Sequence, residues 1–148
     1  MLKSVDKLVV ADEMLEASID EFLDNKRFFS SINLAGVAEE IYGKYVRTTG
    51  QRDVQHDLVE DAIKMSVKQG GPKLDVKEVK EMKKVANHDK NAIKHFDSSS
   101  DRYIEINEEN EARLAIATAI ENHKRADRPN LIAIDRFRKF ATEYVAQK

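Results

Sequence analysis

The residues best suited to chemistry lie close together in the segment KNAIKHFDSSSDRYIEINEE, which begins at Lys90. Lys90, Asn91 and His95 place a cation, an amide and an imidazole within a short stretch. Histidine changes charge near neutral pH and can act as a general base, and a cation can stabilise the charge that develops on an attacked phosphate. Lys94 and Arg102 would add contacts to nucleic-acid phosphates. The candidate site for RNA or a nucleotide therefore has Lys90, Asn91 and His95 as catalytic residues and Lys94 and Arg102 as binding residues.

The same residues also have a structural interpretation, as the C-terminal end of a helix. Lys90 and Lys94 are four residues apart and would share one helix face, with His95 one residue further round. Lysine and histidine near a helix C-terminus interact favourably with the negative end of the helix dipole. The spacing alone does not decide between a functional site and a helix end.

Calcium binding is a second chemistry that this segment could support. Carboxylates and hydroxyls stand at positions 1, 3, 5, 7, 9 and 12 of a possible EF-hand loop, namely Asp97, Ser99, Asp101, Tyr103, Glu105 and Glu108. Arg102, however, occupies position 6, where such loops use glycine for a sharp turn. Asn107 as the N-cap of a following helix, with acidic residues in its first turn, explains the same pattern without a metal. Calcium therefore remains an alternative.

Other residue types offer weaker chemistry. His56 and Glu60 have a spacing that can bind zinc on a helix, but the sequence shows no third ligand. Glu39 and Glu40 lack the ExxH partner of a di-iron bundle, so we expect them to face solvent or to pair with a lysine such as Lys44. His123 lies near the end of an expected helix and is assigned a capping role. The absence of cysteine excludes disulfides and thiolate chemistry, and the sequence predicts no cofactor.

Composition indicates one soluble domain covering residues 1–148. Hydrophobic residues make up 41% and charged residues 35% of the chain, which is typical of a globular protein. The formal net charge of −2 gives no global attraction to nucleic acid, so any such contact needs a local basic patch. No apolar run approaches the roughly 18–20 residues that span a bilayer, and acidic residues interrupt the N-terminal segment. We therefore expect a cytoplasmic protein with no membrane partner.

Apolar residues recur at helical spacing almost throughout the chain, and glycine and proline are scarce. Gly70, Gly71 and Pro72 are expected to end one helix, and Asp75 is expected to cap the next. The second helix has the widest apolar stripe and should be the most buried, with Gly36 allowing another backbone to approach closely. Helices are predicted over residues 4–25, 28–47, 54–68, 75–93, 107–124 and 131–146. The fold class is therefore all-α, a single bundle of five to six helices.

Two segments resemble a known family. The stretch LDNKRFFSSINLAGVAEEIYGKYV, and Asn91, Lys94 and His95 followed by DSSSDRYIEIN, resemble the HEPN-like domains. They are most similar to a group of bacterial proteins with LAGAAEEI and NxxKH segments and no assigned function. The resemblance covers roughly residues 8–120. It implies a small helical bundle that forms a homodimer, with Asn91 and His95 at the polar and histidine positions of a metal-independent ribonuclease motif.

One departure from the family pattern bears on function. Lys90 stands where the motif usually has arginine, and lysine lacks the planar fork that binds phosphate through two hydrogen bonds. Many HEPN-like domains have lost catalysis and serve in binding or dimerisation. The leading hypothesis is therefore a non-catalytic binding or interaction module with a degenerate nucleic-acid or nucleotide site at Lys90, Asn91 and His95. The alternatives are a metal-independent ribonuclease and a calcium-binding helix-loop-helix protein.

Overall fold

The computed structural model describes residues 1–71 and 75–148, and within these residues all regular secondary structure is helical. The α-helices are α1 (Lys7–Asp20), α2 (Phe28–Thr48), α3 (Val54–Lys68), α4 (Val76–Ala86), α5 (His88–Ala92), α6 (Glu108–Arg125) and α7 (Ile132–Ala146). A π-helical turn, η1 (Glu21–Asn25), extends α1, and a 3₁₀ turn, η2 (Ser99–Arg102), lies between α5 and α6. The all-α prediction is confirmed.

The helix boundaries lie within a few residues of the predicted ones, although the first helix begins at Lys7 after an Asp6 N-cap and one predicted helix is divided. Asp75 caps α4 in a capping box with Glu78, and Asn107 caps α6 by accepting a hydrogen bond from the Asn110 backbone N–H. The expected helix over residues 75–93 is divided at Asn87 into α4 and α5, so the described chain has seven α-helices rather than five or six. Gly70 adopts a positive φ of 87° after α3, whereas the expected break at Pro72 lies outside the described residues.

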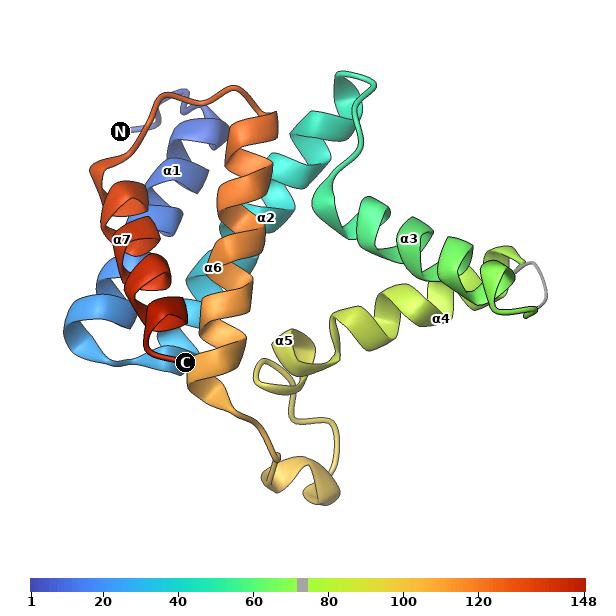
Figure 1. Cartoon of the computed structure of the whole chain (residues 1–148). Coiled ribbons are helices and arrows are strands. Elements are labelled where there is room, and N and C mark those ends of the chain that lie inside the picture. The colour runs from blue at the N-terminus through green and yellow to red at the C-terminus, as the bar shows by residue number, and fades with distance from the viewer. Residues whose placement is uncertain (72–74) are drawn as a thin grey trace.

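The core lies between α1, α2, α6 and α7, which gather into one bundle (Figure 1). Small residues on the facing sides of α2 and α6 let these helices pack closely, and larger side chains fill the space toward α1 and α7. The fully buried large side chains include Leu15, Ile19, Phe22, Ile32, Tyr42 and Ile116. α2 lies at the centre and carries more buried residues than any other described helix, as its wide apolar stripe predicts.

The segment α3–α5 is organised differently from the bundle. The α3–α4 hairpin extends away from the other helices (Figure 1), and Val59 is the one buried residue among the described side chains of α3, α4 and α5. Because the segment α3–α5, called the arm from here on, buries so little apolar surface, it has almost no hydrophobic core of its own. Its position against α2 and α6 therefore depends on specific polar contacts, which also form the candidate site.

A polar network around Asp12 ties the bundle together. The carboxylate of Asp12 on α1 accepts hydrogen bonds from the Tyr42 hydroxyl at 2.6 Å and from the Arg128 guanidinium at 2.6 Å. Burial alone would raise the pKa of Asp12, but Arg128 and Tyr42 hold it below its usual value. Burial, together with the hydrogen bond to Asp12, raises the pKa of Tyr42. The network joins α1, α2 and the α6–α7 connection.

His123 belongs to this core network, which corrects the capping role expected from the sequence. The imidazole is buried, lies edge-on to the Tyr42 ring at a centroid distance of 5.4 Å, and donates to the Pro129 carbonyl. Its Nε2 atom lies 3.9 Å from the Asp12 carboxylate and has no hydrogen-bond partner among the described atoms. Burial lowers the pKa of His123, although the Asp12 charge opposes this change.

The buried imidazole predicts a stability loss in mild acid. Below the ordinary histidine pKa of 6.5 the unfolded chain takes up a proton that folded His123 resists, so the free energy of unfolding falls as the pH falls. The slope from this group approaches about 1.4 kcal/mol per pH unit. His123→Gln should flatten the profile measured by urea unfolding between pH 7.5 and 5, whereas the matched control His88→Gln, at an exposed position, should not. Identical slopes for wild type and His123→Gln would contradict this role.

Candidate functional site

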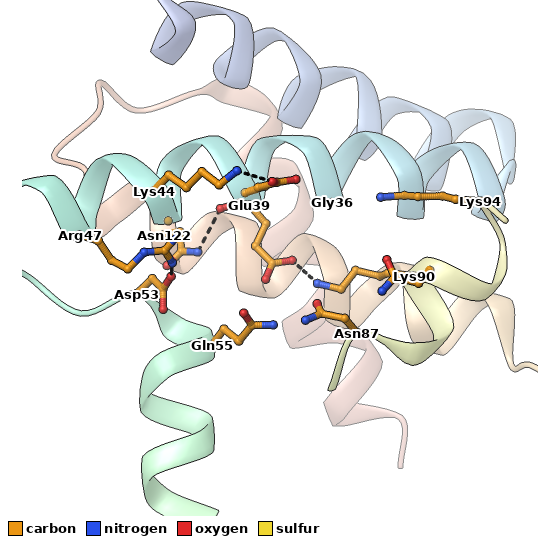
Figure 2. A pocket seen from close by; sticks show the side chains of 13 residues that line it. Gly36, Glu39, Lys44, Arg47, Asp53, Gln55, Asn87, Lys90, Lys94 and Asn122 are labelled. Carbon is orange, nitrogen blue, oxygen red and sulfur yellow. Dashed lines mark hydrogen bonds and ion pairs between the residues drawn. The ribbon is translucent and has the colours of Figure 1, made fainter. Parts of the chain in front are cut away.

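A polar cavity of about 300 Å³ lies where the arm meets the bundle (Figure 2). Its walls come from α2, the start of α3, the α4–α5 junction and α6. The charged side chains around it are Lys44, Arg47, Lys90, Lys94, Glu39, Glu40 and Asp53. The side-chain amides are Gln55, Asn87, Asn91 and Asn122. This wall can donate and accept many hydrogen bonds, and its cations outnumber its carboxylates by one.

One face of α2 forms the floor of the cavity. Gly36, Glu39, Glu40, Gly43 and Arg47 recur at the three- and four-residue spacing that places residues on one side of a helix. A Cβ atom on Gly36 would lie 3.7 Å from Lys94 Nζ and 3.8 Å from Lys90 Cδ. The glycine thus admits lysine side chains, and not the second helix backbone that the sequence led us to expect.

Glu39 and Lys90 form the central ion pair of the cavity (Figure 2). The Glu39 side chain is only 9% exposed and the Lys90 side chain 20% exposed, so both charges have lost most of their water. A buried carboxylate needs such a partner because removing an unpaired charge from water is costly. The sequence predicted that Lys90 acts on a phosphate, but in the structure it forms an ion pair with the carboxylate of Glu39 instead.

Two further ion pairs border the cavity. Lys44 bonds Glu40 at 2.6 Å, as the sequence suggested, and this hydrogen bond lowers the pKa of Glu40. Arg47 pairs with the buried Asp53, whose other carboxylate oxygen accepts the His56 backbone N–H and caps α3. All four side chains line the cavity, and in each pair the carboxylate neutralises the positive charge of its partner.

Lys94 differs from the other cations at the site. It lines the cavity beside Gly36 and forms no ion pair with any side chain that the structure describes. The residue is exposed, and its positive charge contributes to lowering the pKa of Glu40, so the ammonium group can still donate hydrogen bonds to an anion. Of the residues predicted to bind phosphate, Lys94 is therefore the one whose setting fits that role best.

Asn122 is the site residue that the sequence did not reveal. Its amide oxygen accepts the Val54 backbone N–H at 3.0 Å, and its amide nitrogen donates to the Glu39 carbonyl at 3.4 Å. It is fully buried on α6 and contacts the space above Gly43, where a Cβ atom would lie 3.3 Å from its nitrogen. Within its helix it looks like an ordinary polar position, and only its partners on α2 and α3 give it a role.

His95 lies apart from Lys90. It is exposed and lines a neighbouring cavity of about 540 Å³, whereas Lys90 lines the polar cavity. Asn91 lines both spaces and is the link between them. Arg102 is also exposed, and its guanidinium lies 5.3 Å from the centre of the Tyr103 ring. A third cavity, of about 320 Å³, is lined by His95 together with Lys94 and Arg102. His95 therefore lines cavities that Lys90 does not, and Asn91 shares a cavity with each of them.

The residues of the calcium hypothesis form a capped turn. One oxygen of Asp101 accepts the backbone N–H groups of Asp97 at 2.8 Å and Ser98 at 3.1 Å. Glu108 is the first residue of α6. Among the side chains that the structure describes, no three from His, Asp or Glu come close enough together to hold a metal ion. Of the proposed zinc pair, Glu60 is bound to Arg52.

Comparisons of this chain with protein-family models, with curated proteins and with solved structures found no match. Among the helices of the described part, none combines the length and apolar character needed to cross a bilayer. What the site can do is therefore inferred from its side chains and their positions.

The buried amide of Asn122 predicts a measurable contribution to stability. Asn122→Ala leaves the Val54 backbone N–H at the start of α3 without its acceptor, so we expect a loss of about 1–3 kcal/mol in the free energy of unfolding. Urea denaturation measures this loss. The control Asn130→Ala removes an amide at an exposed position and should change stability by less than about 0.5 kcal/mol. Equal effects of the two substitutions would show that Asn122 has no special role.

The Glu39–Lys90 pair predicts a strongly non-additive mutant cycle. Lys90→Met should reduce the free energy of unfolding by about 3 kcal/mol, because it leaves the Glu39 carboxylate buried without a partner. Adding Glu39→Met removes that charge and should restore most of the lost stability. Chemical denaturation of both single variants and the double variant completes the cycle. Additive losses would mean that the two side chains do not interact in solution.

Proposed function

We propose that this chain is a non-catalytic binding module for a nucleotide or nucleic-acid phosphate, with the polar cavity as its site. The observation that supports this most directly is that four cationic side chains and four side-chain amides line one cavity, where three carboxylates pair with three of the cations and leave Lys94 without an ion pair among the described side chains. Cations bind phosphate oxygens, and amides recognise the donors and acceptors of sugars and bases. A cavity of about 300 Å³ is at the small end of small-molecule sites, which favours a nucleotide over an RNA strand.

The geometry favours binding over catalysis. Lys90 is paired with Glu39 and is not free to stabilise a reacting phosphate, and His95 lines a different cavity. Lys94 takes the role of the principal phosphate contact, with Lys44 and Arg47 nearby. The metal-independent ribonuclease remains the alternative function. Asn91 lines both the polar cavity and the cavity of His95, so His95 lies next to the proposed site.

The wider setting of this module is part of the proposal. The resemblance of LAGVAEEI and of the segment with Asn91, Lys94 and His95 to HEPN-like domains supports a HEPN-like fold. The same resemblance supports a homodimer and a bacterial origin, and the cytoplasmic location expected from the sequence completes the proposal. The all-α architecture of the chain is consistent with this assignment.

Titration with nucleotides tests the proposed site. We expect isothermal titration calorimetry to detect binding of ribonucleoside 5′-monophosphates to the full chain, and Lys94→Gln to weaken it by about tenfold through loss of one charge-assisted hydrogen bond. Lys139→Gln removes an equally charged, exposed side chain on α7 and is the matched control. Absence of binding by the wild-type chain, or equal binding by the Lys94→Gln and Lys139→Gln variants, would reject the proposal.

The same preparation distinguishes binding from catalysis. Incubation with a mixed RNA panel in EDTA should leave the RNA intact for both the wild-type chain and the His95→Ala variant. Cleavage by the wild type alone would replace the binding proposal with a metal-independent ribonuclease that uses His95.

A further inference from the structure

The Glu39–Lys90 pair also lines a second, largely apolar cavity of about 240 Å³. Glu39, Gln55 and Lys90 line both this cavity and the polar one, so the two spaces share a wall. The remainder of its surface comes from α3, α4 and α6. The two cavities therefore adjoin along the line where the arm meets the bundle.

Three aliphatic side chains on three different helices surround this second cavity. Leu58 on α3 is 57% exposed, Val85 on α4 is 74% exposed and Leu114 on α6 is 45% exposed. Exposed apolar residues scattered singly are common on protein surfaces, but here they face one hollow beside a charged site. A ligand that covered them would bury apolar surface that the fold itself leaves in contact with water.

We propose that the two cavities form one bipartite site, in which the polar cavity binds the phosphate of a nucleotide and the aliphatic cavity binds its base. This inference rests on the proposed function and adds the place of the base. A nucleobase has apolar faces and a polar edge, which suits a space lined by Leu58, Val85 and Leu114 and also by the polar residues Glu111 and Thr118. Gln55 lies at the boundary and carries both a donor and an acceptor for a base edge.

Because the polar and the aliphatic cavity share Glu39, Gln55 and Lys90, one ligand could occupy both. Lys90 pairs its ammonium with Glu39, and both side chains line the polar and the aliphatic cavity. Ligand sites commonly combine such an apolar surface with a few placed polar groups that set orientation. In this arrangement Lys94 selects for the phosphate, and the aliphatic residues select for the base.

Binding of matched ligands to the full chain tests the base subsite. The probes are inorganic phosphate, ribose 5-phosphate and the four ribonucleoside 5′-monophosphates, measured by calorimetry. We expect at least one nucleotide to bind about tenfold more tightly than ribose 5-phosphate, because only the nucleotide buries a base against the aliphatic residues. Leu58→Ser should remove most of this difference without changing the affinity for ribose 5-phosphate.

A matched control is available on the same helix. Met65 on α3 is 61% exposed, and its position outside the cavity lining makes Met65→Ser a test of general effects on α3. We expect Met65→Ser to bind nucleotides like the wild type, and thermal unfolding to show that both variants remain folded. Both positions are more than half exposed, so neither substitution removes a core contact.

The outcomes separate this inference from the proposed function. If ribose 5-phosphate binds as tightly as every nucleotide, or if Leu58→Ser and Met65→Ser behave alike, the base subsite is rejected while the phosphate site stands. If no phosphorylated probe binds, both proposals are rejected. A nucleotide preference that Leu58→Ser abolishes and Met65→Ser retains supports the bipartite site.

Discussion

Glu39 places a carboxylate on the buried side of α2, where an unpaired charge would be strongly destabilising. Lys90, 51 residues later in the chain, supplies the opposite charge from the short helix α5. Because α3, α4 and α5 have little apolar core of their own, this pair does more to position them than it would on a well-packed helix. The polar cavity and the aliphatic cavity both include this pair in their walls, so the geometry of each depends on it.

Other polar contacts hold the start of α3, where the chain enters the arm. Asn122 accepts the first backbone N–H of α3, and Arg125 of α6 bonds both the Arg52 carbonyl at 3.0 Å and Asp57 at 2.6 Å. Hydrogen bonds are directional, so a few of them can set the angle of a helix that buries little surface. α6 thereby serves two purposes, since one face packs in the bundle core and its C-terminal turns hold the start of α3.

The bundle and the arm contribute different properties to the binding site. The bundle is held by apolar packing and by the network of Asp12, Tyr42, His123 and Arg128, and it provides the rigid floor on α2. The arm has few buried apolar contacts, which is typical of elements that open locally at low free-energy cost. A ligand placed between the two would bury surface on both and strengthen their contact.

The sequence by itself determined the local structure. Apolar periodicity located the helices of the bundle, Asp75 and Asn107 identified two N-caps, and Lys44 was one expected partner of Glu39 or Glu40, of which it pairs with Glu40. These features depend on residues at most four positions apart, whose relative placement follows from helix geometry alone.

Only the tertiary structure decided which distant residues meet. It paired Lys90 with Glu39, buried the side chain of His123 in the core although this residue lies in the last turn of α6, and placed His95 against cavities that Lys90 does not line. It also gave Asn122 its partners. The division of residues 75–93 at Asn87 contributed to this outcome, because a bend in the chain changes the direction of every side chain that follows it. Such contacts depend on how helices pack in three dimensions, which residue spacing along one helix does not specify.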